Sequence, residues 1–254
     1  MKEDVQKQFS QNAEAYVKST IHAKGKDLTK LLEISGASKS DLAIDIATGG
    51  GHVANSLAPL VNKVICYDIT PEILKVAKEF IHGNGHLNTE FKEGDAEQMS
   101  YPDQTFDVVT CRIAPHHFPN VEKFVSEVSR ILKPGGRFLL IDNVVPEDEE
   151  EDKFYNEIEK RRDYSHFRAL KKTEWIKMLE KSGLSILEWY LFPKTFQFED
   201  WSKRMNMSLE EKKSLNDYMI NANQKIKNKF KLVIEDQQVQ SFIGESIILK
   251  AVKA

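Results

Sequence analysis

Cysteine is scarce in this sequence: its 254 residues include two, Cys66 and Cys111. Each lies inside an apolar, strand-like run, where a free thiol behaves as a small buried hydrophobic group. Two such positions supply neither a disulfide framework nor the paired-cysteine pattern of a zinc site. The chain is therefore not a disulfide-stabilised scaffold, and we expect packing of apolar side chains to hold its fold.

Long apolar runs are also missing. No stretch approaches the roughly 20 residues that a helix needs to cross a bilayer. The charged start, Met1-Lys-Glu-Asp-Val-Gln-Lys7, lacks the apolar segment of a signal peptide. We therefore expect a soluble, cytoplasmic protein without a membrane span.

An excess of positive charge is absent as well. Lys and Arg number 36 against 39 Asp and Glu, and they are spread along the chain. No basic face for nucleic acid is evident, nor an Asn or Asp followed by Pro-Pro and an aromatic residue that could hold a flipped base. A small-molecule partner is the better expectation, while the composition leaves the oligomeric state open.

What the sequence does contain, between residues 40 and 145, is an alternation of short β-branched runs with segments of helical period. This pattern predicts an α/β fold in which helices cover both faces of a mostly parallel sheet. Five strands are expected: Leu42–Ile46, Lys63–Asp68, Thr89–Asp95, Phe106–Arg112 and Gly136–Asp142.

After residue 145 the alternation is diluted by long helical stretches. A capped helix is expected at Thr173–Gly183, followed by strands at Ser185–Tyr190 and Glu245–Val252. We therefore expect one domain over 1–254. Its parts would be an N-terminal lid or helix over 1–35, a ligand-binding core over 40–145, cap insertions over 146–170 and 194–240, and segments 173–193 and 241–254 that complete the sheet.

The segment Asp45-Ile-Ala-Thr-Gly-Gly-Gly51 connects the first expected strand to a helix. A glycine loop at this place lets the backbone approach a ligand and directs the helix N-terminus toward it. Gly49, Gly51 and Ala54 also satisfy the dinucleotide pattern, with Asp68 near the spacing of a ribose-binding acid. The loop alone does not distinguish a nicotinamide-dependent oxidoreductase from other nucleotide-binding enzymes.

Three acidic residues help to distinguish between these classes of nucleotide-binding enzyme. Asp45 would repel a pyrophosphate but suits a cation, and S-adenosylmethionine carries an ammonium and a sulfonium without any phosphate. Asp68 can accept hydrogen bonds from ribose hydroxyls, and Asp95 can accept one from an adenine amino group. Each could instead be a turn or cap residue. All three end successive strands, where open α/β sheets bind ligands, and this favours the binding site.

These residues resemble the class I S-adenosylmethionine-dependent methyltransferases, in particular the ubiquinone/menaquinone-biosynthesis-like branch (methyltransferase type 11). The resemblance covers roughly residues 10–145 and, more weakly, the late strands. The motifs that carry it are Asp45-Ile-Ala-Thr-Gly-Gly-Gly51, Tyr67-Asp-Ile-Thr70, Gly94-Asp-Ala-Glu97, Phe106-Asp-Val-Val109 and Glu127-Val-Ser-Arg-Ile-Leu-Lys-Pro-Gly-Gly136.

The resemblance implies a Rossmann-like, three-layer α/β/α fold with a seven-stranded sheet whose last strand is antiparallel, plus a helical cap. It implies S-adenosylmethionine as the methyl donor and S-adenosylhomocysteine as the product. Its cofactor-binding residues would be Tyr16, His22, Asp45, Ala47, Gly49, Gly51, Asp68, Ile69, Asp95, Ala96 and Arg112. The family usually has glycine where this chain has Ala47, a departure that a negative φ would accommodate.

Methyl transfer mainly requires that nucleophile and methyl group be held in line. A base helps when the acceptor must lose a proton, and His116 and His117, after the fourth strand, are the nearest candidates for it. They could equally line the pocket, and adjacent histidines without a spaced carboxylate make a poor metal site. No metal is expected.

The stretch Arg161-Arg-Asp-Tyr-Ser-His-Phe-Arg168 lies where a cap would overhang the substrate. Arg162, His166 and Arg168 are candidates for contacts to a polar or anionic acceptor, although a solvated helix end is the commoner explanation of such a charge run. The leading hypothesis is a small-molecule methyltransferase acting on oxygen, carbon or nitrogen. The alternatives are an NAD(P)-dependent oxidoreductase and a non-catalytic cofactor-binding module.

Overall fold

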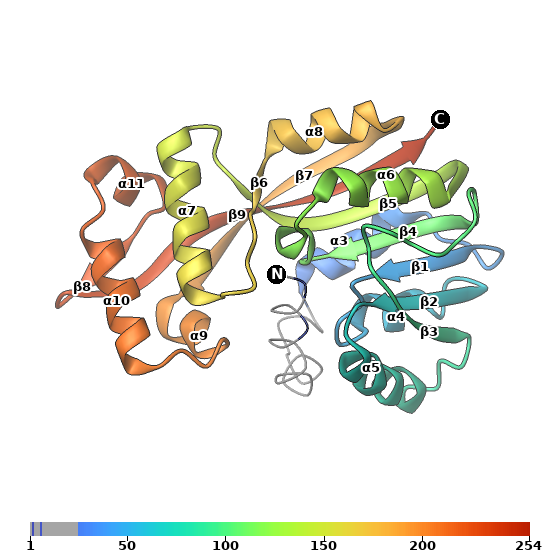
Figure 1. Cartoon of the computed structure of the whole chain (residues 1–254), viewed down its shortest axis with the longest axis horizontal. Helices are drawn as coiled ribbons and strands as arrows, with labels where there is room; N and C mark the ends of the chain where they lie inside the picture. Colours follow the sequence, from blue (N-terminus) through green and yellow to red (C-terminus); the bar gives the residue numbers. More distant parts are fainter. Residues whose placement is uncertain (1, 3–5, 7–24) are drawn as a thin grey trace.

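The computed structural model describes residues 2, 6 and 25–254 (Figure 1). The strands in this part of the chain are β1 (Leu42–Ile46), β2 (Lys63–Asp68), β3 (Thr89–Glu93), β4 (Phe106–Arg112), β5 (Leu132–Val145), β6 (Leu170–Lys171), β7 (Leu184–Gln197), β8 (Val233–Glu235) and β9 (Gln238–Lys253). They form one sheet in the order β3-β2-β1-β4-β5-β9-β7, with β6 beside β5 and β8 beside β9.

The sheet has the strand directions that the resemblance implied. β2 and β4 flank β1 in parallel, β3 is parallel to β2, and β5 is parallel to β4. The last strand, β9, runs antiparallel to the three strands that it pairs with, β5, β7 and β8. The expected sheet, mostly parallel with an antiparallel last strand, is confirmed.

Helices cover both faces of this sheet. In the described part they are α3 (Lys26–Ser35), α4 (His52–Leu57), α5 (Pro71–Gly83), η1 (Pro115–His117), α6 (Val121–Ile131), α7 (Glu149–Arg162), α8 (Lys172–Lys181), α9 (Phe198–Lys203), α10 (Leu209–Ile220) and α11 (Gln224–Lys229). Buried residues of α3, α4 and α5 form one cluster with the sheet, and those of α6 and α8 form a second. This is the three-layer arrangement.

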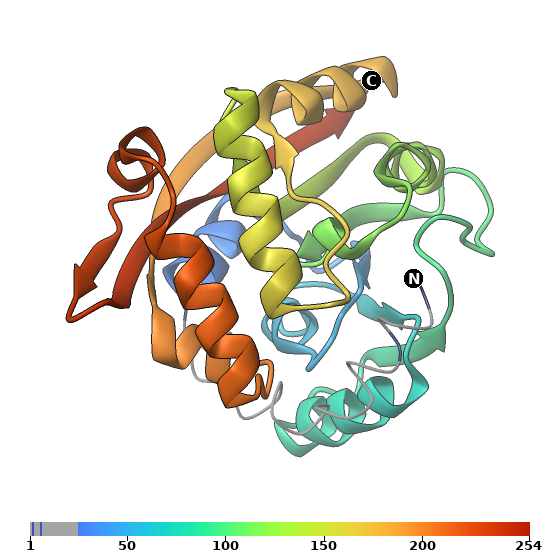
Figure 2. The same ribbon diagram turned by 60° about the vertical axis from the view of Figure 1, so that its left-hand side comes forward.

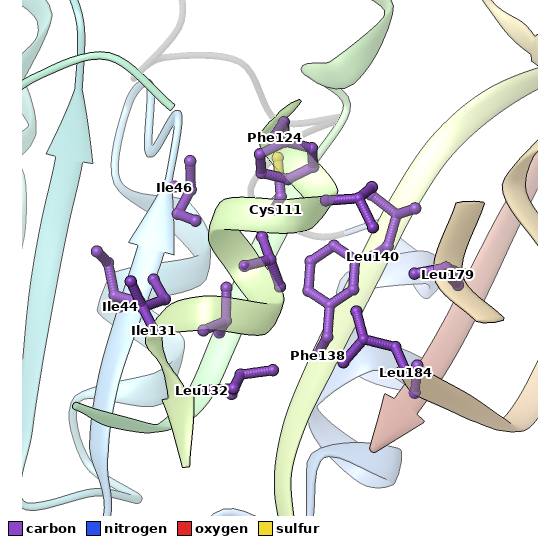
Figure 3. Packing of buried hydrophobic residues seen from close by; sticks show 14 of the residues in the cluster. Ile44, Ile46, Cys111, Phe124, Ile131, Leu132, Phe138, Leu140, Leu179 and Leu184 are labelled. Atoms are coloured by element: carbon purple, nitrogen blue, oxygen red, sulfur yellow. The ribbon is translucent and has the colours of Figure 1, made fainter. Parts of the chain in front are cut away.

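The helix α6 shows how the sequence produces these layers. Its apolar residues recur at helical spacing and are all buried. At its start the side chain of Asn120 accepts a hydrogen bond from the backbone N–H of Lys123 at 2.9 Å. Figure 3 shows Phe124 and Ile131 of α6 packed with Ile44, Ile46 and Phe138 of the strands. Apolar side chains that repeat with the helical period of about 3.6 residues therefore pack against side chains that alternate along the strands, and together they form one apolar layer.

Several strand ends differ from the expectation. β5 begins at Leu132 rather than Gly136, because Leu132 already pairs with Phe106 before the register shifts. β7 continues to Gln197 and β9 begins at Gln238, so both strands enter the segment expected to be an insertion over 194–240. The two strands pair with each other along this extension, where Gln197 lies opposite Ser241.

The cap is built around that extension. α7 and the helices α9, α10 and α11 gather on it, on the left in Figure 1 and in front in Figure 2. Their apolar side chains form a third cluster with the strands, which includes Tyr155, Phe196, Trp201 and Phe242. The sheet thus runs continuously from the core into the cap. Within the described ranges, no helix combines the length and apolar character needed to cross a membrane.

Candidate functional site

Two adjoining hollows open at the carboxyl ends of β1, β2 and β4. The first encloses a cavity of about 120 Å³ and is lined by Asp45, Ala47, Thr48, Gly49, Gly50, His52, Val53, Asp68, Ile69, Ile73, Arg112, Ile113, Ala114, His117 and Phe118. The second is lined by Lys2, Ala47, Tyr67, Asp68, Ile69, Gly94, Asp95, Ala96, Glu97, His117, Phe118 and Pro119. They share five residues, so they form one elongated site at the expected edge of the sheet.

The loop between β1 and α4 has an unusual backbone. Gly49 and Gly51 have φ of +52° and +80°, values at which glycine is favoured. A Cβ on Gly51 would lie 2.7 Å from Cδ1 of Ile81 in α5. Gly51 therefore allows both the turn and the close packing of α5 on the loop.

Ala47 departs from the expectation. Its φ is +52°. The expectation of a negative φ, which would have accommodated its methyl group, is therefore wrong. A left-handed conformation costs a residue with a Cβ roughly 1 kcal/mol. Ile113, after β4, also has a positive φ of +55° and lines the same hollow. Strain of this kind often occurs at functional sites.

Asp45 is almost fully buried, with 1% of its surface exposed. Its two carboxylate oxygens accept hydrogen bonds from the hydroxyls of Thr48 and Thr110, each at 2.7 Å. Burial raises the pKa of Asp45 to about 6, and the hydroxyls and Arg112 only partly oppose this. Its negative charge is therefore costly in the absence of a compensating positive charge.

Asp68 ends β2 and is also buried. Its carboxylate accepts hydrogen bonds from the backbone N–H groups of Gly49 and Thr70, both at 3.0 Å. Burial again raises its pKa to about 6. Since each carboxylate oxygen has two lone pairs, acceptor capacity is left for ribose hydroxyls.

The second hollow contains the third acid. Asp95 accepts a hydrogen bond from the backbone N–H of Glu97 at 2.9 Å. It also forms an ion pair with Nζ of Lys2 at 2.5 Å. Gly94, just before it, lies against Tyr67 so closely that a Cβ would stand 1.9 Å from the hydroxyl. Asp95 and Ala96 line the second hollow and Arg112 lines the first, so an elongated ligand that fills both would meet them with different parts.

Arg112 and Ile69 both line the site. The guanidinium of Arg112 is paired with Asp27 of α3 at 2.7 Å, and its side chain is 6% exposed. The carbonyl of Ile69 accepts a hydrogen bond from the Gln6 side chain at 2.8 Å. Tyr16 and His22, the expected lid contacts, lie outside the described residues.

His117 is the histidine that faces both hollows. Its Nδ1 lies 3.1 Å from the carbonyl oxygen of Ser165. Because a carbonyl only accepts, Nδ1 carries the proton and the lone pair resides on Nε2. Burial, together with the nearby His116, lowers the pKa of His117 to about 4. His117 is thus a neutral imidazole near neutral pH.

His116 has a different environment. Its Nδ1 lies 2.6 Å from Oδ1 of Asp142 in β5, and it is absent from the linings of both hollows. Burial lowers the pKa of His116, but Asp142 outweighs this effect and the net direction is upward. The centroid of its ring lies 4.2 Å from that of the His117 ring, and the two rings are tilted by 44°. His116 is therefore placed to position its neighbour rather than to touch a ligand.

The three residues expected on the acceptor side have protein partners. Arg162 forms an ion pair with Glu159 at 2.7 Å, and Arg168 binds both Asp152 and Glu174. His166 is buried and lies 2.9 Å from Oδ1 of Asn156. None of the three lines either hollow. Arg162 nevertheless lies near enough to His117 for its charge to lower the pKa of that imidazole.

Sequence reasoning missed several residues of this site. Thr48 and Thr110 hold Asp45, and Ser165 with Asp163 holds His117. Thr48 was visible within the loop motif. Ser165 and Asp163 are separated from His117 by two helices and a strand, so no local pattern could have indicated that they contact it.

The site fits a cationic, elongated ligand. Asp45 and Asp68, both buried and both with a raised pKa, line the same hollow as the glycine loop. A ligand with positive charge would offset the desolvation of these carboxylates, whereas a pyrophosphate would add repulsion. In the described residues, no group of three His, Cys, Asp or Glu side chains is arranged to hold a metal ion.

Comparisons with known proteins agree with this geometry. Residues 44–140 match the methyltransferase domain model Methyltransf_11. The crystal structure of a candidate methyltransferase (BH2331) from Bacillus halodurans C-125 is 53% identical, covers 90% of this chain and 99% of that one, and has a TM-score of 0.88. The structure of Bacillus subtilis YcgJ has the same TM-score at 32% identity and covers 91% of this chain and 99% of its own.

Two relatives by sequence support the same family. The uncharacterized methyltransferase YcgJ of Bacillus subtilis is 34% identical over 96% of this chain and 97% of its own length. The ubiquinone/menaquinone biosynthesis C-methyltransferase UbiE of Teredinibacter turnerae is 31% identical over 54% of this chain and 55% of its own. These findings favour a methyltransferase over the nicotinamide-dependent alternative. The chain therefore belongs to the class I S-adenosylmethionine-dependent methyltransferase family.

Proposed function

We propose that this protein binds S-adenosylmethionine and transfers its methyl group to a small-molecule acceptor through oxygen, carbon or nitrogen. The observation that carries the proposal is the pair of buried carboxylates, Asp45 and Asp68, beside the glycine loop. Family membership supports the reaction class. The identity of the acceptor is a separate question.

In this proposal the residues that line the two hollows, together with Gly51 of the loop beside them, divide the donor between them. Asp45, Ala47, Gly49, Gly51 and Arg112 hold the methionine portion. Asp68 and Ile69 hold the ribose, and Asp95 with Ala96 holds the adenine. When bound, the donor supplies a methyl carbon activated by the sulfonium.

His117 is the proposed base when the acceptor must lose a proton. Its protonated Nδ1 is held by the Ser165 carbonyl, which leaves Nε2 as the proton acceptor. Ser165 is held in turn, because its hydroxyl donates to Asp163 at 2.6 Å. The pairing of His116 with Asp142 fixes the neighbouring ring. In this scheme His117 is the catalytic residue and His116 a positioning residue.

The first test compares ligands by isothermal titration calorimetry. Wild-type protein is expected to bind S-adenosylmethionine and S-adenosylhomocysteine but not NAD. Asp68→Ala should weaken donor binding by about 2 to 4 kcal/mol, because two hydrogen bonds to the ribose are lost. Asp217→Ala, an exposed acid of α10, serves as the control and should bind normally. Binding of NAD without the methyl donor would overturn the proposal.

The second test concerns the base. With labelled donor and a small-molecule extract as acceptor source, His117→Gln should lower kcat on the order of 10²- to 10⁴-fold while leaving S-adenosylhomocysteine affinity intact. Because the pKa of His117 is about 4, protonation of this base should not reduce kcat between pH 8 and 5. His116→Asn removes the neighbouring positive charge, so the acid limb should move to higher pH. Wild-type kcat in His117→Gln would reduce His117 to a lining residue.

The non-catalytic alternative is distinguished by the same assay. Tight donor binding with no methyl transfer to any fraction of the extract would favour a binding module.

A further inference from the structure

Asp163 is a buried acid whose charge the proposed function does not use. It directly follows α7 and is 1% exposed. Its Oδ1 accepts two hydrogen bonds from Ser165, one from the backbone N–H at 2.9 Å and one from the hydroxyl at 2.6 Å. Its other oxygen, Oδ2, is also buried, and no donor in the described part of the chain reaches it. One oxygen of this carboxylate is therefore desolvated without compensation, which is costly.

The turn after α7 does not require this charge. Both hydrogen bonds from Ser165 end on the same oxygen of Asp163. The side-chain carbonyl of an asparagine would accept both of them, and it would avoid the cost of burying a charge. The turn therefore accounts for an oxygen at this position but not for a carboxylate.

The neighbouring acids already have cationic partners. Glu159 pairs with Arg162 at 2.7 Å, and Asp142 pairs with His116 at 2.6 Å. Among the residues that the structure describes, Asp163 has no partner of opposite charge at ion-pair distance. Of these three acids, Asp163 is the one whose charge is not matched by a direct ion pair.

The hydroxyl of Ser165 connects Asp163 to His117. Because an ionised carboxyl only accepts, this hydroxyl donates its proton to Asp163, and its oxygen is left as an acceptor. That oxygen lies 3.2 Å from Nδ1 of His117, and the carbonyl oxygen of Ser165 lies 3.1 Å from the same nitrogen. The proton on Nδ1 is therefore shared between two oxygens of Ser165, one of which is polarised by Asp163.

The charges of Asp163 and His117 act on each other. Burial raises the pKa of Asp163, but His117, the hydrogen bonds from Ser165 and the charge of Arg162 outweigh burial, and the net direction is downward. Asp163 is therefore ionised near neutral pH. Burial and the charge of His116 lower the pKa of His117, and Asp163 opposes them.

The other charged and titratable groups around His117 come from both of its sides. Those in the core and the cap are His116, Asp142, Glu159, Arg162 and His166, and those that line the first hollow with it are Asp45, Asp68 and Arg112. Asp45 is hydrogen-bonded to two threonine hydroxyls and Asp68 to two backbone N–H groups. Asp163 is the acid that a path of hydrogen bonds joins to the imidazole of His117.

We propose that Asp163 is a positioning residue that acts through Ser165 and stabilises the imidazolium formed when Nε2 of His117 takes a proton from the methyl acceptor. That proton stays on Nε2, Nδ1 keeps its own, and Asp163 remains ionised throughout. The negative charge is thus in place before the positive charge develops, and it needs no rearrangement to stabilise it. The inference rests on the proposed function, in which His117 is the base.

The first measurement needs neither donor nor acceptor. In protein with 15N-labelled histidine, the ring 15N shifts report the pKa of His117, and His116→Asn is the background because it should raise this pKa from about 4. Addition of Asp163→Asn should lower it again, because a nearby negative charge is lost. The proton should stay on Nδ1, since Ser165 still accepts from it. Asp217→Asn, at an exposed acid of α10, is the control and should change neither. An unchanged His117 pKa on addition of Asp163→Asn would overturn the proposal.

The second measurement is kinetic. Asp163→Asn should lower kcat for methyl transfer on the order of 10-fold, with KM for the acceptor within about twofold, because Asp163 lines neither hollow. Ser165→Ala keeps the charge but removes the hydroxyl, and it should lower kcat similarly. The double variant should be no slower than the slower single variant, since both changes interrupt one path. Losses of kcat that multiply would contradict this path. An unchanged kcat in Ser165→Ala would overturn the proposal even if Asp163→Asn failed to fold.

Calorimetry with S-adenosylhomocysteine separates this inference from the proposed function. All variants should bind this product normally, which also verifies that they are folded. If wild-type protein fails to bind it, the proposed function itself is wrong. If wild-type protein binds it, and Asp163→Asn lowers the pKa of His117 without lowering kcat, then the charge acts on a histidine that is not the base. In that case the inference fails while the methyltransferase assignment stands.

Discussion

At the scale of single residues, burial determines which charges are costly. Asp45 and Asp142 are each 1% exposed and lie on strands of the same sheet. Asp142 has His116 as a partner at 2.6 Å, whereas Asp45 has two neutral hydroxyls. The same residue type therefore has an ion-pair partner at one position and only neutral hydrogen-bond donors at the other.

Asp45→Asn is expected to stabilise the ligand-free protein at pH 7.5 by about 1 to 3 kcal/mol. The folded pKa of Asp45 is raised from its ordinary value of 3.8 to about 6. The folded state thus holds the proton more tightly, and the carboxylate destabilises it above pH 6. The gain should fade as pH falls from 6 toward 4. Chemical denaturation at pH 7.5, 6 and 4.5 measures it.

Asp142→Asn is the matched control, and it should destabilise the protein because His116 loses its partner. Asp45→Asn should also lose most of its affinity for S-adenosylmethionine, so stability and binding change in opposite directions. Unchanged stability at pH 7.5 would show that Asp45 is not a strained charge in the folded protein.

At the scale of elements, two residues with a positive φ in the loop between β1 and α4 differ in that one has a Cβ and the other has none. Ala47 carries a methyl group at φ +52°, where glycine would be favoured. Gly51 lacks one at φ +80°, where a Cβ would meet Ile81. One position therefore stores strain that the other avoids.

Exchanging the residue types tests this account. Ala47→Gly should make the protein up to about 1 kcal/mol more stable, since relief of the left-handed alanine exceeds the added freedom of the unfolded chain. Gly51→Ala should destabilise it by about 2 kcal/mol or more, because φ and the contact with Ile81 are both unfavourable. Thermal unfolding of the two variants measures the changes. Equal midpoints for both would contradict the strain assignment.

At the scale of the whole molecule, the core and the cap share two strands. β9 pairs with β5 in the core and with β7 from Ser241 to Lys253, which includes the extension into the cap. Unfolding of the cap would therefore disrupt the ends of β7 and β9, two strands that also belong to the core. We expect the two regions to unfold together.

Tryptophan fluorescence can report on each region separately. Trp175 is buried in α8 against the core cluster, and Trp201 is buried in the cap cluster. In each of two variants one of these tryptophans is retained, and the other and Trp189 are changed to Phe. For each variant the midpoint of guanidinium unfolding followed by fluorescence is compared with the midpoint followed by circular dichroism. The difference between these two midpoints should be the same for both variants. An earlier transition of the Trp201 signal would indicate a cap that unfolds independently.

Local patterns in the sequence were sufficient to determine the core of this protein. Apolar periods and turn residues placed β1, β2 and β4 at their observed bounds, because each strand is buried on both faces and needs a continuous apolar run. The same patterns placed Asp45, Asp68 and Asp95 at the strand ends, where one edge of a parallel sheet brings them together. The methyltransferase family followed from these motifs.

Tertiary structure alone decided the rest. The extension of β7 and β9 into the cap depends on pairing between distant strands, and the φ of Ala47 depends on packing around the loop. The two adjacent histidines differ because one meets Asp142 and the other the Ser165 carbonyl. Sequence period determines which residues are buried, whereas long-range contacts determine what each buried polar group meets.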